Sequence, residues 1–200
     1  MSNSEESNLA GALSAHQAIW VWSAAAGLTT VALLLGGREH ADSILAGAAF
    51  GLCALNTLID WRTMTLIPLW SHLAGVLWIV QAGVYTVRGT WQIPAAAALC
   101  ALVLGSCAAG VHRASPQSFG RGDVRLIVVL TLWVGNSGPF FVLLFVGCAS
   151  ALQLVAFAVQ EIKFRMRAAA LREPRRVLPF GAALVAGAWS IYIGSAYIAG

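Results

Sequence analysis

Two aspartates are the residues of this sequence best placed for chemistry, because each lies beside an apolar segment. Asp60 directly follows the apolar segment 43–59, and Asp123 directly precedes the apolar segment 124–135. Two carboxylates that share one water molecule can hydrolyse a peptide bond by acid–base catalysis. If both ionise about 5 Å apart they repel by roughly 3 kcal/mol, so such a pair holds a single proton near neutral pH. We therefore take Asp60 and Asp123 as the candidate catalytic pair.

The composition indicates what kind of element must position these residues. Hydrophobic residues make up 59% of the chain and charged residues only 10%, and the mean hydropathy is +0.78. A soluble domain carries about 25% charged residues. We therefore predict an all-α fold, a polytopic transmembrane helical bundle in a lipid bilayer. The net charge of +4 does not indicate a nucleic-acid partner, because the basic residues follow the membrane topology instead.

About seven apolar segments are separated by glycine, proline and charged residues, as expected for about seven membrane spans. They cover residues 17–35, 43–59, 69–87, 93–111, 124–135, 140–160 and 180–198. Residues 1–16 are polar and lack a signal-peptide pattern, so we predict a disordered cytoplasmic tail. Residues 17–200 are predicted to form a single transmembrane domain.

The basic residues set the expected orientation of these spans. With the N-terminus in the cytoplasm, ten lysines and arginines fall on the inner side and only Arg38 and Arg88 on the outer side. An excess of basic residues marks the cytoplasmic side of membrane proteins. We therefore expect a plasma (inner) membrane protein with Asp60 and Asp123 facing the cytoplasm.

Each aspartate also has an ordinary structural alternative. The alternative for Asp60 is an interfacial charge beside Trp61 and Arg62, and the alternative for Asp123 is a helix N-cap, a position that aspartate favours. The segment 124–135 is only about 18 Å long as a helix, against a hydrocarbon core of about 30 Å. If its far end reaches the outer surface, a short helix that starts at Asp123 holds this carboxylate inside the membrane, where it needs a partner or a wet cavity.

Three neighbours of Asp123 are candidate substrate-binding residues. Gly120 and Gly122 would let the backbone turn tightly and approach a substrate strand. Arg125 would orient or balance the charge of the pair, the alternative being that it extends toward lipid headgroups. His72 and His112 lie near inner ends of spans, a position that is more often structural than catalytic.

The four cysteines give no sign of a metal centre. All lie within apolar segments, and none forms a CxxC pair. Thiols in this setting are typical of helix packing, so we expect neither a disulfide nor a metal site. No organic cofactor is expected for a mechanism based on two carboxylates.

Three ordered motifs resemble those of the type IV prepilin peptidases, which are membrane aspartyl proteases of the GxGD class. The first is Asp60 with Arg62, followed by Ile67-Pro68; the second is Phe119-Gly120-Arg121-Gly122-Asp123-Val124-Arg125-Leu126; the third is Leu178-Pro179-Phe180-Gly181. The resemblance extends from about residue 43 to the C-terminus. It implies that residues 17–200 are a peptidase domain in which Asp60 and Asp123 are catalytic.

The same resemblance implies the substrate and the partners. The substrate would be a prepilin or pseudopilin, cut on the cytoplasmic side between a basic leader and a hydrophobic helix. Pilus-assembly components or further copies of the chain are possible partners. The paired cysteines of the methyltransferase region have no counterpart, so we expect a short form with peptidase activity and without methyltransferase activity.

The chain departs from the family pattern at four positions. Pro68 lies eight residues after Asp60, where the family usually has seven. Leu69 replaces a polar residue, Arg125 replaces a lysine and Ala182 replaces a proline. We expect these differences to bear on substrate choice more than on fold.

Two other functions stay open from the residues alone. A small proton-coupled transporter would use the aspartates as a relay, but would favour internal repeats and carboxylates near the membrane midplane. A pilus-assembly scaffold would keep the fold without proteolysis, which the altered spacing to Pro68 favours.

Overall fold

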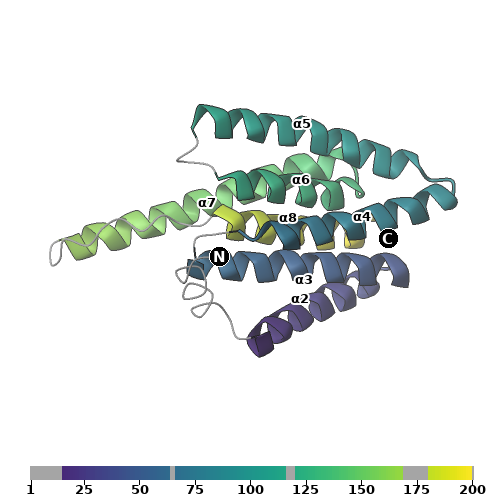
Figure 1. The fold of residues 1–200 in the computed structure, drawn as a ribbon, viewed down its shortest axis with the longest axis horizontal. Helices are drawn as coiled ribbons and strands as arrows, with labels where there is room; N and C mark the ends of the chain where they lie inside the picture. Colours follow the sequence, from purple (N-terminus) through teal and green to yellow (C-terminus); the bar gives the residue numbers. More distant parts are fainter. Residues whose placement is uncertain (1–14, 64–65, 116–119, 169–179, 200) are drawn as a thin grey trace, which may run out of the picture.

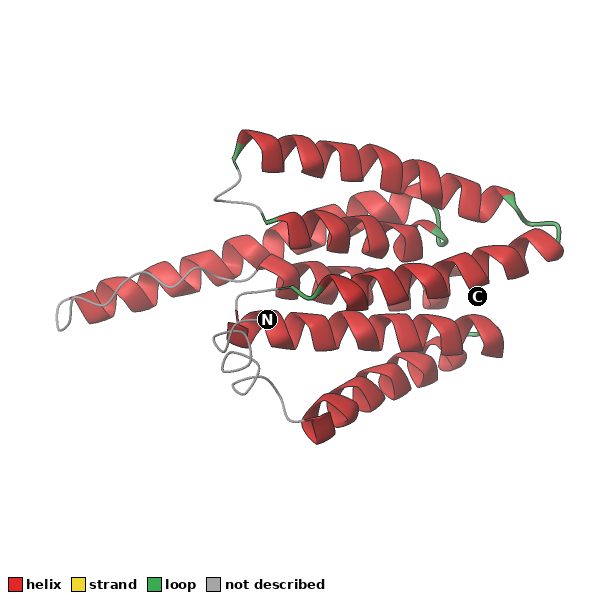
Figure 2. Ribbon diagram, in the orientation of Figure 1, coloured by secondary structure: helices red, strands yellow, loops and turns green. Residues whose placement is uncertain are grey.

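The computed structural model describes residues 15–63, 66–115, 120–168 and 180–199, and within these ranges it contains seven α-helices. In chain order they are α2 (Ala15–Leu35), α3 (His40–Thr63), α4 (Pro68–Val87), α5 (Gln92–Ala114), α6 (Arg121–Gly135), α7 (Pro139–Ala168) and α8 (Phe180–Ala199). The described ranges contain no β-strand, as Figure 2 shows. The predicted all-α fold is therefore confirmed.

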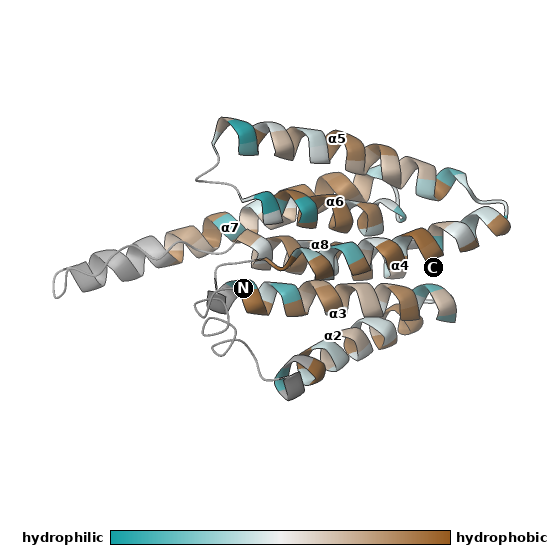
Figure 3. Cartoon of the chain, in the orientation of Figure 1, coloured by the Kyte–Doolittle hydropathy of each residue, from teal (hydrophilic) through white to brown (hydrophobic). Residues whose placement is uncertain are grey.

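Four helical segments are long and apolar enough to cross a membrane: His40–Asp60, Gln92–Ala114, Pro139–Val159 and Phe180–Ile198. α2 contains a shorter apolar stretch, Ile19–Leu35. Large apolar side chains are exposed on the outside of the bundle, among them Ile79, Leu102 and Leu143, and apolar residues run along the helices in Figure 3. An exposed apolar surface of this extent suits lipid rather than water. The chain is therefore a membrane protein in which about seven spans are plausible.

Successive helices run in alternating directions, so that their ends gather at two opposite ends of the bundle (Figure 1). One end holds the C-termini of α3 and α5 and the N-termini of α4, α6 and α8. We term it the aspartate end, because Asp60 and Asp123 both lie there. The opposite, distal end contains the turns at Gly37, Gly89 and Gly138. These glycines have positive φ angles of 81°, 78° and 119°, which other residues rarely adopt.

α6 is the central helix, in contact with α4, α5, α7 and α8. Its side chains Leu126, Leu130 and Val134 are fully buried. The buried indole of Trp133 donates a hydrogen bond to the carbonyl oxygen of Ala74 in α4, at 3.1 Å. Because protein covers most of this helix, its 15 residues need not match the thickness of a bilayer.

Several helix boundaries differ from the predicted ones. α6 begins at Arg121 rather than at Asp123, which lies in its first turn. α3 continues through Asp60 to Thr63, and α7 continues to Ala168 instead of ending at residue 160. Hydropathy detects only the apolar part of a helix, so it does not detect the polar turns at either end. Of the predicted tail, residues 1–14 lie outside the described residues and the last two begin α2.

The distal turn after α6 is recessed into the bundle. Asn136 donates to the Oε1 of Gln81 at 2.9 Å and accepts from the indole of Trp78 at 3.3 Å. Gln81 lies in α4 more than a turn before that helix ends at Val87. The turn that follows α6 therefore lies short of the distal end of α4, which accounts for part of the short length of α6. The predicted depth of Asp123 does not follow from helix length alone.

α7 and α8 approach closely at a pair of small residues. A Cβ atom built on Gly187 would lie 3.0 Å from the backbone nitrogen of Ala149 and 3.1 Å from its Cα. Small residues at such crossings let membrane helices pack backbone to backbone. Gly187 therefore fixes the distance between these two helices.

We expect Gly187→Val to lower the free energy of unfolding by about 2 kcal/mol, because a clash with backbone atoms cannot be relieved by rotating a side chain. Unfolding in mixed micelles titrated with sodium dodecyl sulfate measures the change. Gly194→Val is the matched control, since Gly194 lies in the same helix and a Cβ there meets nothing within 4 Å. Equal destabilisation by both substitutions would contradict the packing role of Gly187.

Candidate active site

Asp60 is almost fully buried at the aspartate end, with 7% of its surface exposed. Its Oδ2 lies 3.5 Å from the position that a Cβ of Gly181 would take in the first turn of α8. Leu126 of α6 approaches the same position, also to 3.5 Å. Among the side chains that the structure describes, no cation forms an ion pair with Asp60. A carboxylate with so little exposure loses most of its hydration, which is costly and argues against a simple headgroup-level anchor.

Asp123 is the half-buried third residue of α6. Its Oδ2 accepts a hydrogen bond from the backbone N–H of Gly120 at 3.1 Å. Gly120 is the N-cap residue, and Asp123 reaches back to it as the acidic residue of a capping box does. Asp123 thus caps its helix from inside the first turn, not from the predicted N-cap position. Its negative charge is also favourable near the positive end of the helix dipole.

The two carboxylates lie near each other although 62 residues separate them in sequence. Asp60 and Asp123 are close enough for their charges to interact electrostatically. Leu66, in the connection between α3 and α4, lies near residues that neighbour each of the two carboxylates. A Cβ on Gly122 would meet the Leu66 Cβ at 2.7 Å, and a Cβ on Gly181 would meet the Leu66 Cδ2 at 3.7 Å. The end of α3 and the starts of α4, α6 and α8 therefore form one site.

Neither glycine of the second motif has a positive φ angle, and only Gly122 packs closely against another segment. Gly120 has φ −75° and ψ 155°, an extended conformation open to any residue. Gly122 lies within α6, and only a hydrogen atom fits between it and Leu66. The described residues show no tight turn at these glycines, and their expected role in approaching a substrate stays a prediction.

Arg125 lies apart from the carboxylate pair. It lines a cavity between α5 and α6, together with Arg113, Arg121 and His112. Helical periodicity places residues 121, 124 and 125 on one side of α6, and Gly122 on the side that meets Leu66. The structure thus brings Asp60, Asp123 and Gly122 together and places Arg125 at a separate cavity.

The other candidate residues are distributed around the bundle. His72 is exposed near the start of α4, and His112 lines the α5–α6 cavity. All four cysteines have free thiols, with Cys53 buried in the core. Among the described residues no group of three or more metal-ligating side chains occurs. Of the third motif, Leu178 and Pro179 lie outside the described residues.

Asn56 is a positioning residue that the sequence interpretation missed. It is fully buried in α3, one helical turn before Asp60. Its Oδ1 accepts a hydrogen bond from the backbone N–H of Ile67 at 2.8 Å, and its Nδ2 donates to the hydroxyl of Ser71 at 3.3 Å. Asn56 therefore fastens the start of α4, and with it Leu66, to the helix that carries Asp60. A polar amide inside an apolar segment, four residues from a candidate catalytic aspartate, was the available signal.

If the site cleaves peptide bonds as the sequence motifs predict, Asn56→Leu should lower the rate about tenfold and stability by about 2 kcal/mol, because the backbone N–H of Ile67 loses its acceptor. Substrate cleavage and detergent unfolding, measured on the same preparation, separate the two effects. Ser71→Ala is the matched control, since it removes only the 3.3 Å hydrogen bond and should lower both quantities less. An unchanged rate in a destabilised Asn56→Leu protein would contradict the positioning role.

Comparison of the chain with models of protein families, with curated proteins and with solved structures gave no match. The candidate site consists of a buried aspartate and a half-buried one, which come from segments distant in sequence and lie near Leu66 and two glycines.

Proposed function

We propose that the chain is a membrane-embedded aspartic endopeptidase whose catalytic groups are Asp60 and Asp123. The observation that carries this proposal is the placement of two carboxylates from distant segments around Leu66, Gly122 and Gly181 at one end of a membrane bundle. A purely structural role explains the capping contact of Asp123. It does not explain a second carboxylate buried beside it, because two like charges destabilise each other unless one carries a proton.

In the proposed reaction the pair holds one proton and binds a water molecule. The ionised aspartate removes a proton from this water, and the water oxygen attacks the carbonyl carbon of the scissile peptide. The protonated aspartate donates its proton to the carbonyl oxygen. The tetrahedral intermediate then collapses and the C–N bond breaks. The aspartate that took the proton from water gives it to the leaving amine, and the other aspartate takes a proton from one hydroxyl of the intermediate, which restores the singly protonated pair.

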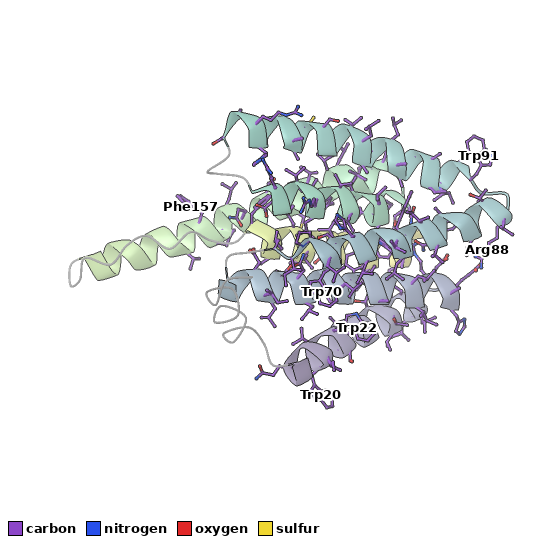
Figure 4. All side chains as sticks on the ribbon, in the orientation of Figure 1. Trp20, Trp22, Trp70, Arg88, Trp91 and Phe157 are labelled. Atoms are coloured by element: carbon purple, nitrogen blue, oxygen red, sulfur yellow. The ribbon has the colours of Figure 1, made fainter. Side chains whose placement is uncertain are left out.

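The proposed substrate is a prepilin-like membrane protein with a basic leader, a small residue before the cut and a hydrophobic helix after it. This proposal rests on the three sequence motifs and on a site at the end of membrane helices. Described helices at the aspartate end carry Arg113, Arg121, Arg125, Lys163, Arg165 and Arg167. The distal end carries Arg38 and Arg88 (Arg88 is labelled in Figure 4), and Arg88 is paired with Glu39. This asymmetry supports a cytoplasmic aspartate end and cytoplasmic N-terminus in the plasma membrane.

The test is cleavage of several candidate prepilins by the purified chain in proteoliposomes. Mass spectrometry should find a shortened product whose new N-terminus lies at the junction between leader and hydrophobic helix. The proposal fails if the folded chain cuts none of the substrates, an outcome that favours the scaffold. Proton flux across the same proteoliposomes without cleavage would instead favour the transporter.

A further inference from the structure

The cavity between α5 and α6 at the aspartate end is a separate candidate site. Its volume is about 720 Å³, and it is lined by Ala109, His112, Arg113, Arg121, Val124 and Arg125. His112 and Arg113 lie in the last turn of α5, while Arg121 and Arg125 lie in the first two turns of α6. Two helices that are consecutive in the chain therefore direct their basic ends into one hollow.

The cavity concentrates positive charge that the described carboxylates do not neutralise. Arg113, Arg121 and Arg125 are all exposed, and none forms an ion pair with a carboxylate among the side chains that the structure describes. Three guanidinium groups around one space repel each other and attract an anion. Guanidinium groups bind phosphate oxygens in pairs of parallel hydrogen bonds. The chemistry of the lining therefore suits a phosphate.

The position of the cavity indicates which phosphate it would hold. The candidate span Gln92–Ala114 ends at the cavity, the level at which lipid headgroups lie in a membrane. Leu99, Leu102, Val103 and Val111 are exposed along the same helix. A phospholipid would match both features, with its headgroup in the basic cavity and its acyl chains along this apolar surface. A free phosphate would use only the first.

We propose that the α5–α6 cavity binds the phosphate headgroup of an anionic phospholipid, whose acyl chains lie along the exposed apolar side of α5. The site is distinct from the Asp60–Asp123 pair. Its function does not require that the chain be a peptidase. Bound lipid would fix the position of α6, and hence of Asp123, relative to the membrane surface.

Native mass spectrometry of the full chain in detergent tests the proposal, with phosphatidylglycerol and phosphatidylcholine added at equal concentrations. We expect the unmodified chain to prefer phosphatidylglycerol. The triple variant R113Q/R121Q/R125Q should bind it roughly a hundredfold more weakly, since each basic residue near an anionic lipid contributes about a factor of five. R113K/R121K/R125K, which keeps the charges, should retain most of the preference.

Arg88→Gln at the distal end is the matched control and should leave lipid binding unchanged. Equal binding of the two lipids by the unmodified chain would overturn the proposal, as would full phosphatidylglycerol binding by the triple glutamine variant. Displacement of the lipid by millimolar inorganic phosphate would also overturn it, because it would identify a site for free phosphate. All of these outcomes are measured without substrate cleavage, so they are independent of the proposed peptidase function.

Discussion

Asp60→Asn and Asp123→Asn are each expected to lower the rate of prepilin cleavage at least about a thousandfold, the scale of a lost general acid or base. An asparagine amide can neither take a proton from the attacking water nor donate one to the leaving amine. Because the two carboxylates act as one unit, the double variant should be no slower than either single one. Initial cleavage rates in proteoliposomes measure the effect.

Asp42→Asn is the matched control for these substitutions. Asp42 is also a buried aspartate of α3, but it lies at the distal end. There its Oδ2 accepts a hydrogen bond from the hydroxyl of Tyr85 at 3.1 Å. We expect this variant to lose stability and to keep its cleavage rate. Cleavage that survives either Asp60→Asn or Asp123→Asn would rule out the two-aspartate mechanism.

The helices themselves could be predicted from the sequence because hydropathy directly reflects the apolar environment of each span. The same signal is poor at helix ends. It placed the start of α6 at Asp123 because Arg121 and Gly122 are not apolar, although α6 begins two residues earlier, at Arg121, with Gly120 as its N-cap. That shift moves Asp123 from the capping position into the first turn.

Contacts between helices could not be predicted from the sequence. Alternating spans place Asp60 and Asp123 at the same end, but nothing in the sequence indicated that Leu66 packs between Gly122 and Gly181. Arg125 was assigned to the pair because it lies two residues from Asp123. In a helix, residues two positions apart lie on different sides. A side chain that interacts with the carboxylate pair should lie on the same side of α6 as Asp123. Asn56, by contrast, was detectable from its i, i+4 spacing to Asp60.

Gly122→Val is expected to lower the cleavage rate about a hundredfold, the scale of a 1 Å displacement of catalytic groups. The new Cβ would lie 2.7 Å from the Cβ and 2.9 Å from the Cδ1 of Leu66. A clash at a Cβ atom cannot be relieved by rotation of the leucine side chain. Either the α3–α4 connection or the start of α6 must therefore move. This movement would change the position of Asp123 relative to Asp60.

Gly110→Val separates this geometric effect from the general cost of placing valine in a helix. Gly110 lies in the last turns of α5, near the same end of the bundle, and a Cβ there meets nothing within 4 Å. Both variants introduce the same β-branched residue into a helix, so their helix propensities change equally. Only Gly122→Val should lose activity, measured as the cleavage rate of the folded fraction. If the two variants cleave equally well, Leu66 and Gly122 do not set the geometry of the pair, and the site must tolerate movement of the α3–α4 connection.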